Sequence, residues 1–480
     1  MKQHYEQRDE RAGLPQLRAL ATQAFSRAAG APLVHRNQVR LLKDARENYP
    51  AWLEAIRAAR RHVYFEMYFI EEDDRGREFA DALIGKAREG VPVRLVYDWM
   101  GGFRRATRRF WNALRDGGVE VRCYNPLQPE SPLGWLSRDH RKMIAVDGEV
   151  GFISGLCVGL GWVGAPERGV EPWRDTGVEI RGPAVAEIER AFAGTWEACG
   201  GPIAESELRG SPAAAGDVSL RIVASEPATA GMLRLDQLVA ALARQRLWLT
   251  DAYYAGTPSY VQALRAAARD QVDVRLLVPN STDIPLLRPL SRAGYRPLLE
   301  AGVRVFEWNG SMLHAKTAVA DGHWARVGST NLNVASWFGN RELDAVIEDD
   351  VFAREMEQMY LEDLGNATEV VLDRRRKLSA PGEPRHPNPV GAGGGSGSAK
   401  QAAAGAIRIG NAIGAAFTDR RVLGPIEARL ATTTGLLLCA VSILVALIPQ
   451  ALAFPLVALG AWGGLALLYK GYELHRRRKD

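Results

Sequence analysis

Short apolar runs rich in β-branched residues alternate with stretches of helical periodicity along most of the chain. The run HVYFEMYFI at 62–70 predicts a buried strand, and the segment at 73–90 places apolar residues at helical spacing. A strand-like segment at 91–98, a helical stretch at 108–116 and a further strand-like segment at 119–124 follow in order. This alternation predicts an α/β fold, with mixed sheets flanked by helices.

The second half of the chain repeats the order of the first. The segments VPVRLVYD and VDVRLLVP begin at Val91 and Val272, which are 181 residues apart, and matching helices and strands surround both. A constant offset across several elements indicates an internal duplication. We therefore expect an N-terminal helical segment at 1–35, a first lobe at 36–215 and a second lobe at 216–377.

The last part of the chain has a different character. Residues 431–469 contain no Asp, Glu, Lys, Arg or His, and a helix that crosses a bilayer needs about 20 such residues. Pro449 divides the run into halves at about 431–448 and 451–469, and cationic residues flank the run on both sides, which favours both ends in the cytoplasm. We expect a membrane helical hairpin within a tail at 406–480. A buried hairpin of a soluble protein is the alternative, although a soluble core seldom runs so long without polar residues.

Composition narrows the class of protein further. The Pro-, Gly- and Ser-rich residues 378–405 predict a flexible linker between the lobes and the tail. The chain has 61 Lys and Arg against 56 Asp and Glu, and a formal charge of +5 is too small to indicate a coat of nucleic acid. The four cysteines show no metal-binding spacing, and we do not expect a disulfide framework. No cofactor is expected. The N-terminus carries no apolar run behind its charges and does not resemble a secretion signal.

The same motif, HxKxxxxD, ends each repeat. Its required residues are His140, Lys142 and Asp147 in the first copy and His314, Lys316 and Asp321 in the second, and we expect all six in a catalytic site. Side chains two apart on a strand project from one face, so each histidine points the same way as its lysine. An imidazole exchanges protons or attacks near neutral pH, and an ammonium suits a phosphate oxygen. If the lobes pack face to face, both pairs converge on one anionic group, for which a phosphodiester is the best candidate.

Residues downstream of the second motif extend this hypothesis. The segment Gly328-Ser329-Thr330-Asn331 could aim backbone and side-chain donors at a phosphate, and we expect Ser329 and Asn331 to bind it. Glu342 follows His314 by 28 residues and could orient its imidazole; Asp175 is the equivalent candidate in the first half. For either acid, a surface salt bridge is the alternative.

The paired HxKxxxxD motifs, with GSTN after the second, resemble the phospholipase D superfamily over roughly residues 36–365. Within it, the segments GVPVRLVYDWMGG, WRDTGVEIRGPAV and HWARVGSTNLN are most similar to bacterial cardiolipin synthases of the group without an N-terminal membrane anchor. The resemblance implies two pseudo-twofold lobes, no metal and a covalent phosphohistidine. It also implies transfer of a phosphatidyl group between lipids, with phosphatidylglycerol as the usual donor and acceptor. We expect a bacterial inner-membrane protein with its catalytic body on the cytoplasmic side.

The first motif departs from the family in one place. Cys157 ends the segment Ser154-Gly155-Leu156-Cys157, where the family pattern has Asn. A thiol is a poor hydrogen-bond donor, so the phosphate cradle of the first lobe is weakened or completed by another residue. We interpret Cys157 as a small buried side chain; a nucleophilic role is the less favoured alternative.

The expected mechanism uses the two imidazoles in turn. His140 attacks phosphorus while His314 protonates the departing alcohol and then deprotonates the incoming hydroxyl. The expected partners are membrane phospholipids and the bilayer, without nucleic acid, and the oligomeric state is not assigned. Three alternatives stay open: hydrolysis of phospholipids to phosphatidic acid, cleavage of nucleic acid, and a catalytically silent membrane scaffold.

Overall fold

The computed structural model of the chain describes residues 20–126, 137–165, 167, 169–208, 213–283, 287–372, 378–379 and 462. The expected linker and the expected membrane hairpin lie outside the described residues, except for 378–379 and 462. Within the described ranges, no helix combines the length and the apolar character needed to cross a bilayer.

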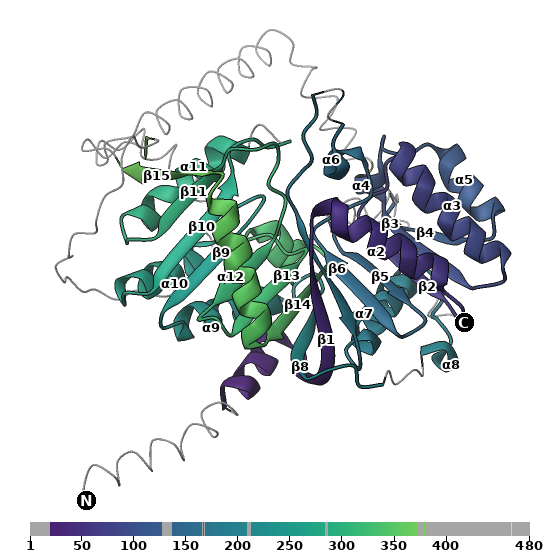
Figure 1. Cartoon of the computed structure of the whole chain (residues 1–480), viewed down its shortest axis with the longest axis horizontal. Helices are drawn as coiled ribbons and strands as arrows, with labels where there is room; N and C mark the ends of the chain where they lie inside the picture. Colours follow the sequence, from purple (N-terminus) through teal and green to yellow (C-terminus); the bar gives the residue numbers. More distant parts are fainter. Residues whose placement is uncertain are drawn as a thin grey trace, which may run out of the picture.

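One sheet of 16 strands runs through both lobes (Figure 1), in the order β16-β15-β11-β10-β9-β12-β13-β14-β8-β1-β7-β6-β5-β2-β3-β4. The strands of the first lobe are β1 (Val34–Lys43), β2 (Val63–Met67), β3 (Val93–Asp98), β4 (Glu120–Tyr124), β5 (Lys142–Val146), β6 (Val150–Ser154) and β7 (Thr176–Arg181). The strands of the second lobe are β8 (Val218–Ser225), β9 (Arg246–Thr250), β10 (Asp273–Pro279), β11 (Arg304–Trp308), β12 (Thr317–Ala320), β13 (Trp324–Gly328), β14 (Glu342–Glu348), β15 (Ala367–Leu372) and β16 (Leu378–Ser379).

The strand order confirms the α/β class and the repeat. The antiparallel pair β1 and β8 lies at the centre, and outward from it β7, β6, β5, β2, β3 and β4 hold the same places as β14, β13, β12, β9, β10 and β11. The expected boundary near residue 215 falls just before β8.

Helices cover the sheet in both lobes. Those of the first lobe are α2 (Asp44–Ala58), α3 (Asp74–Arg88), α4 (Trp99–Gly102), α5 (Arg108–Asp116), α6 (Leu160–Val163), α7 (Val185–Ala198) and α8 (Glu205–Leu208). Those of the second are α9 (Gly231–Leu242), α10 (Pro258–Arg269), α11 (Leu287–Leu299), the short π-helix η3 (Ala335–Gly339) and α12 (Asp350–Leu364). Residues 20–29 form a further helix before β1. Side-chain caps begin several helices where the chain leaves a strand or loop: Asp73 caps α3, Thr107 caps α5 and Asp349 caps α12.

The lobes share a hydrophobic core as well as a strand pair. Each lobe has its own apolar cluster, and a third cluster joins them, with Leu41 and Val178 from the first lobe and Leu220 and Ile347 from the second. Strand β6 contacts β13 and β14, and β7 contacts β13. The lobes are therefore held together both along the edge between β1 and β8 and through their packed faces.

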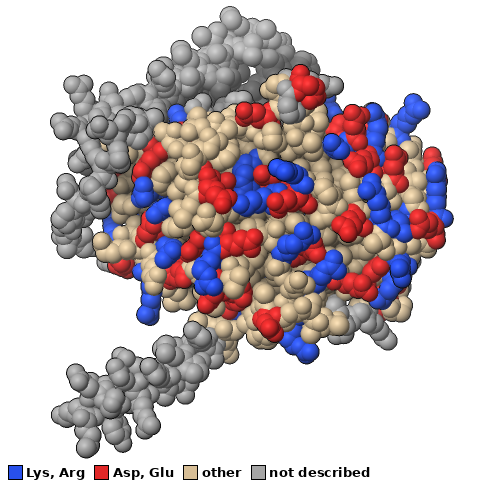
Figure 2. Space-filling view, viewed as in Figure 1, with Lys and Arg blue, Asp and Glu red and all other residues tan. Residues whose placement is uncertain are grey.

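The surface carries charges of both signs. On the face drawn in Figure 2, Lys and Arg side chains are interspersed with Asp and Glu, and neither sign forms a continuous band. Ion pairs between partly exposed side chains, such as Arg304–Glu369 and Lys43–Glu362, also occur in the described part of the chain. This face agrees with the small net charge of the chain.

Candidate active site

The two histidines precede equivalent strands and are bonded to the opposite lobe. His140 lies just before β5 in the first lobe, and its N–H donates to the carbonyl of Arg341 in the second lobe (2.9 Å). His314 lies before β12 in the second lobe, and its N–H donates to the carbonyl of Arg174 in the first (2.7 Å). Each histidine is therefore held by the other lobe through the backbone.

The orienting carboxylates also cross between the lobes. Nδ1 of His140 lies 2.9 and 3.1 Å from the two carboxylate oxygens of Glu342, and Nδ1 of His314 lies 2.8 Å from Oδ2 of Asp175. The prediction that each acid orients the histidine of its own half was wrong in its pairing. The reason is a pair of β-bridges between the lobes, Asp139 with Arg341 and Arg174 with Leu313. Because Glu342 follows Arg341 and Asp175 follows Arg174, each carboxylate lies next to the histidine of the opposite lobe. Neither acid forms a surface salt bridge, because both are fully buried.

This contact assigns a role to each ring nitrogen. With the carboxylate of Glu342 as partner, Nδ1 of His140 carries the proton and donates it, which leaves a lone pair on Nε2. Nδ1 of His314 lies 2.8 Å from both Oδ2 of Asp175 and Nζ of Lys316; because Lys316 also has the carbonyl of His314 as acceptor, we assign the Nδ1 proton to the bond with Asp175. Among the hydrogen bonds of the described residues, none involves Nε2 of His140 or His314. Nε2 is therefore the atom on each ring that is available for phosphorus or a proton.

Burial keeps both imidazoles neutral near pH 7. Burial lowers the pKa of His140, with Lys142 adding to the effect and Glu342 opposing it. Burial and the adjacent Lys316 lower the pKa of His314 to about 4, against the opposing effect of Asp175. An entering phosphate, being anionic, favours protonation of either ring.

Both carboxylates stay ionised despite their burial. Burial alone would raise the pKa of Glu342, but the interaction with His140 brings it below its usual range. Burial acts in the same way on Asp175, and His314 and Lys316 bring its pKa below its usual range. Two ionised carboxylates therefore stand ready to stabilise a protonated imidazole.

The lysines bring the two half-sites into one electrostatic environment. Lys142 donates to the carbonyl of His140, and Lys316 donates to the carbonyl of His314. The charge of Lys142 lowers the pKa of His314, and the charge of Lys316 lowers that of His140, so each lysine acts across the lobe boundary. Burial brings the pKa of Lys316 down to about 8, which still leaves it mainly protonated at pH 7. The geometry thus brings together both predicted His–Lys pairs.

Two tyrosines that the sequence analysis missed line the site symmetrically. The ring of Tyr68 lies 5.0 Å from that of His140, with Nζ of Lys142 at 5.1 Å from the tyrosine ring. Tyr253 lies 5.7 Å from His314, with Nζ of Lys316 at 5.8 Å. Both tyrosines follow equivalent strands, β2 and β9, but Tyr68 comes directly after its strand whereas Tyr253 is the third residue after its own. The expected strand at 62–70 ends earlier, at Met67, which places Tyr68 beside the histidine.

The aromatic surroundings of the two histidines differ. Trp162 and Trp173 lie 5.5 and 5.7 Å from His314, and Nε1 of Trp162 donates to Asp175 (2.9 Å). Asn340, by contrast, donates to Glu342 on the other side (3.1 Å). Trp162, Trp173 and Asn340 could not be assigned to the site from the sequence, because they lie at no regular spacing from the HxKxxxxD motifs.

The expected phosphate-binding residues lie beside the pairs. The hydroxyl of Ser329 accepts from the N–H of Leu343 (2.9 Å), while Oδ1 of Asn331 is buried without a hydrogen-bond partner among the described residues. Oδ1 is an acceptor and cannot bond a phosphate oxygen, so the expected phosphate contact would use the Nδ2 donors of Asn331. In the first lobe, Cys157 is buried near both motif lysines, and burial raises the pKa of its thiol. A neutral thiol therefore stands where the second lobe has an amide.

Asp147 and Asp321 lie away from the histidines. The full length of β5 separates Asp147 from His140, and its carboxylate accepts the backbone N–H groups of residues 60–62 at 2.7–2.9 Å. Asp321 follows β12 and accepts those of residues 244–246 at 2.8–2.9 Å. This geometry favours a structural role for both aspartates over the expected catalytic one. In the described part of the chain, no group of three or more His, Cys, Asp or Glu could hold a metal ion.

Residues 52–196 and 239–364, one stretch in each lobe, match the protein family described as cardiolipin synthase, PLD-like domain. The chain is 31% identical over 345 residues to a cardiolipin synthase of Alkalihalophilus pseudofirmus, covering 71% of this chain and 68% of that protein. It is 33% identical over 356 residues to cardiolipin synthase A of Pseudomonas fluorescens, covering 72% of each.

Among solved structures, phosphatidylserine synthase of Haemophilus influenzae matches with a TM-score of 0.57 at 15% identity, covering 73% of this chain and 91% of that one. At that identity the likeness shows a shared fold. Both family matches contain one complete HxKxxxxD motif.

Proposed function

The chain belongs to the cardiolipin synthase family with PLD-like domains, and we propose that it transfers a phosphatidyl group between two phospholipids to form cardiolipin. Two phosphatidylglycerol molecules are the proposed donor and acceptor, with glycerol released. The observation that carries the proposal is the crossed site, in which His140 bonds Glu342 and His314 bonds Asp175 across the lobe boundary. Such a site provides two imidazoles and two ammoniums for one phosphodiester.

The first half-reaction forms a phosphatidyl–histidine. Nε2 of His140 attacks phosphorus, and the bond from phosphorus to the glycerol oxygen breaks. Protonated His314 donates its Nε2 proton to that oxygen, a contribution typically worth about 10²–10⁴-fold. Asp175 supports this step because its charge stabilises the protonated ring.

The second half-reaction restores the enzyme. His314, now neutral, takes the proton of the incoming lipid hydroxyl as that oxygen attacks phosphorus. The bond from phosphorus to His140 breaks, and cardiolipin leaves. Lys142 and Lys316 stabilise the charge that builds on the phosphoryl oxygens in both steps, with Asn331 as a further contact.

A membrane hairpin in the tail would keep this body at its substrate. The charge-free run at 431–469 is about twice the length of one span, and cationic residues flank it. We propose a bacterial inner-membrane location with the lobes on the cytoplasmic side. Truncation after residue 405 should release the protein from membranes washed with carbonate, whereas retention in the membrane would contradict the hairpin.

Product analysis tests the proposed function. Purified protein is incubated with phosphatidylglycerol labelled in its headgroup and acyl chains, in the presence of a chelator. Cardiolipin and free glycerol in equal amounts are expected, and neither should appear with His140→Ala or His314→Ala. Phosphatidic acid as the main product would instead identify a hydrolase. The mixed charge on the face in Figure 2 weighs against a nuclease, and cleavage of single-stranded DNA without turnover of lipid would overturn the proposal.

A further inference from the structure

Arg174 holds the chain beside His314. It precedes Asp175 in the sequence and is 8% exposed. Its N–H donates to the carbonyl of Met312 (2.8 Å), and its carbonyl accepts the N–H of His314 (2.7 Å). The backbone of Arg174 therefore fixes the segment that carries His314 on both sides of Leu313.

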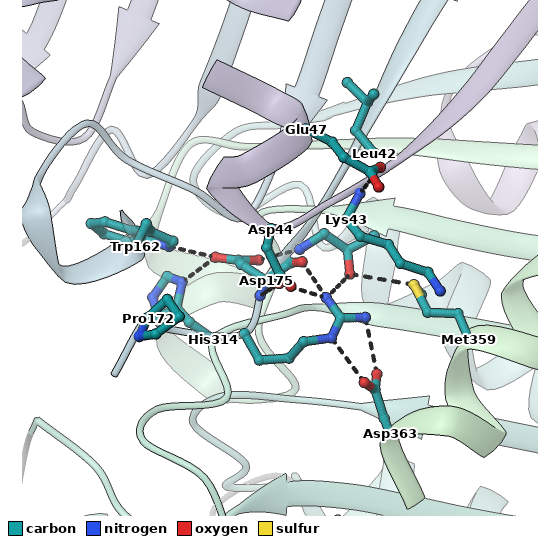
Figure 3. Close-up of polar contacts among 12 residues, drawn as sticks. Leu42, Lys43, Asp44, Glu47, Trp162, Pro172, Asp175, His314, Met359 and Asp363 are labelled. Carbon is teal, nitrogen blue, oxygen red and sulfur yellow. Dashed lines mark hydrogen bonds and ion pairs between the residues drawn. The ribbon is translucent and has the colours of Figure 1, made fainter. Parts of the chain in front are cut away.

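The guanidinium of Arg174 joins the two lobes (Figure 3). Its Nε and Nη2 donate to the two carboxylate oxygens of Asp363, on α12 of the second lobe, at 2.9 and 3.0 Å. Its Nη1 donates to Asp44 and Thr176 at 3.1 Å each, and also to the carbonyl of Asp175. All three guanidinium nitrogens of Arg174 therefore donate hydrogen bonds, and two of them form a bidentate ion pair with Asp363 across the boundary between the lobes.

Asp175 is held through both its backbone and its side chain. Its N–H donates to Asp44 (2.8 Å), and its carbonyl accepts the N–H of Asp44 (3.0 Å). Its carboxylate accepts from Trp162 and His314, and a Cβ added at Gly155 would lie 2.1 Å from its Oδ1. Because the side chain is enclosed, the position of the carboxylate follows that of the backbone that Arg174 holds.

We propose that Arg174 and Asp363 are positioning residues whose ion pair sets the orientation and the proton affinity of His314 through Asp175. The inference rests on the proposed role of His314 as acid and base. Asp363 also balances the charge of Arg174, and an unbalanced guanidinium beside Asp175 would disfavour a protonated imidazole.

The other half-site is built differently: the buried guanidinium that donates to the carbonyl of Glu342 is that of Arg141 in the first lobe, and its ion-pair partner is Glu66, at 4.0 Å. Arg341 occupies the equivalent place beside Glu342, and its ion-pair partner among the described residues is Glu226, whose side chain is 48% exposed. No described counterpart of Asp363 contacts Arg341. The pair formed by Arg174 and Asp363 therefore acts on His314 rather than on His140.

Four titratable groups face His314, and of these only Asp175 is hydrogen-bonded to Arg174. They are Asp175 before β7, Lys316 before β12, Lys142 at the start of β5 and the ring of Tyr253 after β9. A change in the titration of His314 on replacing Asp363 is therefore due to Arg174 and the carboxylate that it holds.

Asp363→Asn tests the proposal, with Glu362→Gln as the matched control. Glu362 is the preceding residue of α12 and also pairs across the lobes, with Lys43, but its side chain is 51% exposed. Asp363→Asn should lower kcat about 10-fold or more, with little change in KM, because a small displacement of a catalytic group is costly. The limb of the pH–rate profile that reports His314 should move to lower pH by about one unit. Glu362→Gln should keep the wild-type kcat and profile, and Asp363→Glu should recover part of the loss.

Rates are measured as the sum of the cardiolipin and phosphatidic acid formed. They are divided by the amount of folded protein, which is measured by circular dichroism. Asp363→Asn with a wild-type pH profile and a wild-type kcat per folded protein would overturn the positioning role. A wild-type enzyme that releases only phosphatidic acid would overturn the proposed transfer, while the comparison of Asp363→Asn with Glu362→Gln could still be made on that product.

Discussion

Each imidazole of the site is hydrogen-bonded through Nδ1 to a carboxylate from the opposite lobe. The distances are 2.9 Å from His140 to Glu342 and 2.8 Å from His314 to Asp175. A buried guanidinium also donates to the backbone carbonyl of each acid, from Arg141 to Glu342 and from Arg174 to Asp175. At the scale of single residues, therefore, neither lobe contains a complete half-site.

Glu342→Gln should affect His140 and leave His314 nearly unchanged. The charge of Glu342 raises the pKa of His140, so its removal should lower that pKa further, while Asp175 continues to act on His314. Turnover should fall on the order of 10²–10⁴-fold, because the ring loses its orientation and the charge that supports its protonated state. NMR titration of selectively labelled histidines measures both pKa values.

Asp175→Asn is the control for that titration: it should lower the pKa of His314 and leave that of His140 nearly unchanged. A shift of His314 on replacing Glu342 would contradict the crossed pairing.

Gly155→Ala should reduce activity by displacing a carboxylate. A Cβ at this position would lie 2.1 Å from Oδ1 of Asp175, so the acid must move away from His314. A displacement of this kind costs about 10-fold or more in kcat. Gly194→Ala in α7, where a Cβ meets no atom within 4 Å, should leave kcat unchanged and stabilise the helix by about 0.5–1 kcal/mol. Equal kcat for the two variants would contradict the enclosed position of Asp175.

At the scale of elements, the HxKxxxxD motif joins two functions at opposite ends of one strand. The histidine and lysine lie at the start of β5 or β12, and the aspartate lies just after its end with φ of 59° at Asp147 and 51° at Asp321. This left-handed backbone turns each carboxylate toward N–H groups just before β2 or at the start of β9. The aspartates thus fix the pairing of the strands that carry the site.

Asp147→Ala should destabilise the fold without changing the chemistry. Three backbone N–H groups at residues 60–62 lose their acceptor, at a cost of about 1–3 kcal/mol for each group left buried and unpaired. Urea denaturation measures the free energy of unfolding, and kcat per folded protein should stay within about threefold of wild type. A loss of kcat as large as that of His140→Ala, with unchanged stability, would restore the catalytic role.

Local pattern predicted the elements better than their contacts. Helix α5 begins and ends at the predicted residues 108 and 116, because caps and periodicity are local properties. The strand predicted at 62–70 was too long, since Tyr68 leaves the sheet to face His140. The crossing of Glu342 and Asp175 could not be predicted, because no local signal states which lobe will lie beside a given segment.

At the scale of the whole molecule, the duplication produces one active centre rather than two. The sheet is continuous through β1 and β8, and one apolar cluster draws residues from both lobes. The motifs alone indicated the phospholipase D superfamily, and that resemblance was confirmed. The sequence predicted that the lobes pack face to face, but it did not predict that β1 and β8 pair to join their sheets. Strand pairing between distant segments depends on the tertiary structure.

Thermal unfolding of the two lobes should be a single cooperative transition. Separating them would expose the shared cluster, which includes Val178 and Leu220, and would break the strand pair at the centre of the sheet. Differential scanning calorimetry of the full chain should give one transition whose calorimetric and van't Hoff enthalpies agree. Two resolved transitions would contradict the account of a shared core.

The central claim is that both lobes act on a single phosphodiester, and the number of covalent phosphatidyl groups per chain tests it most directly. Enzyme mixed with excess ³²P-labelled phosphatidylglycerol is quenched in alkali during turnover, and the labelled protein is digested and mapped. The account predicts no more than one labelled group per chain, on His140, and no label in His140→Ala. Label on both His140 and His314 of the same chain, approaching two groups per chain, would show two independent sites and contradict the account.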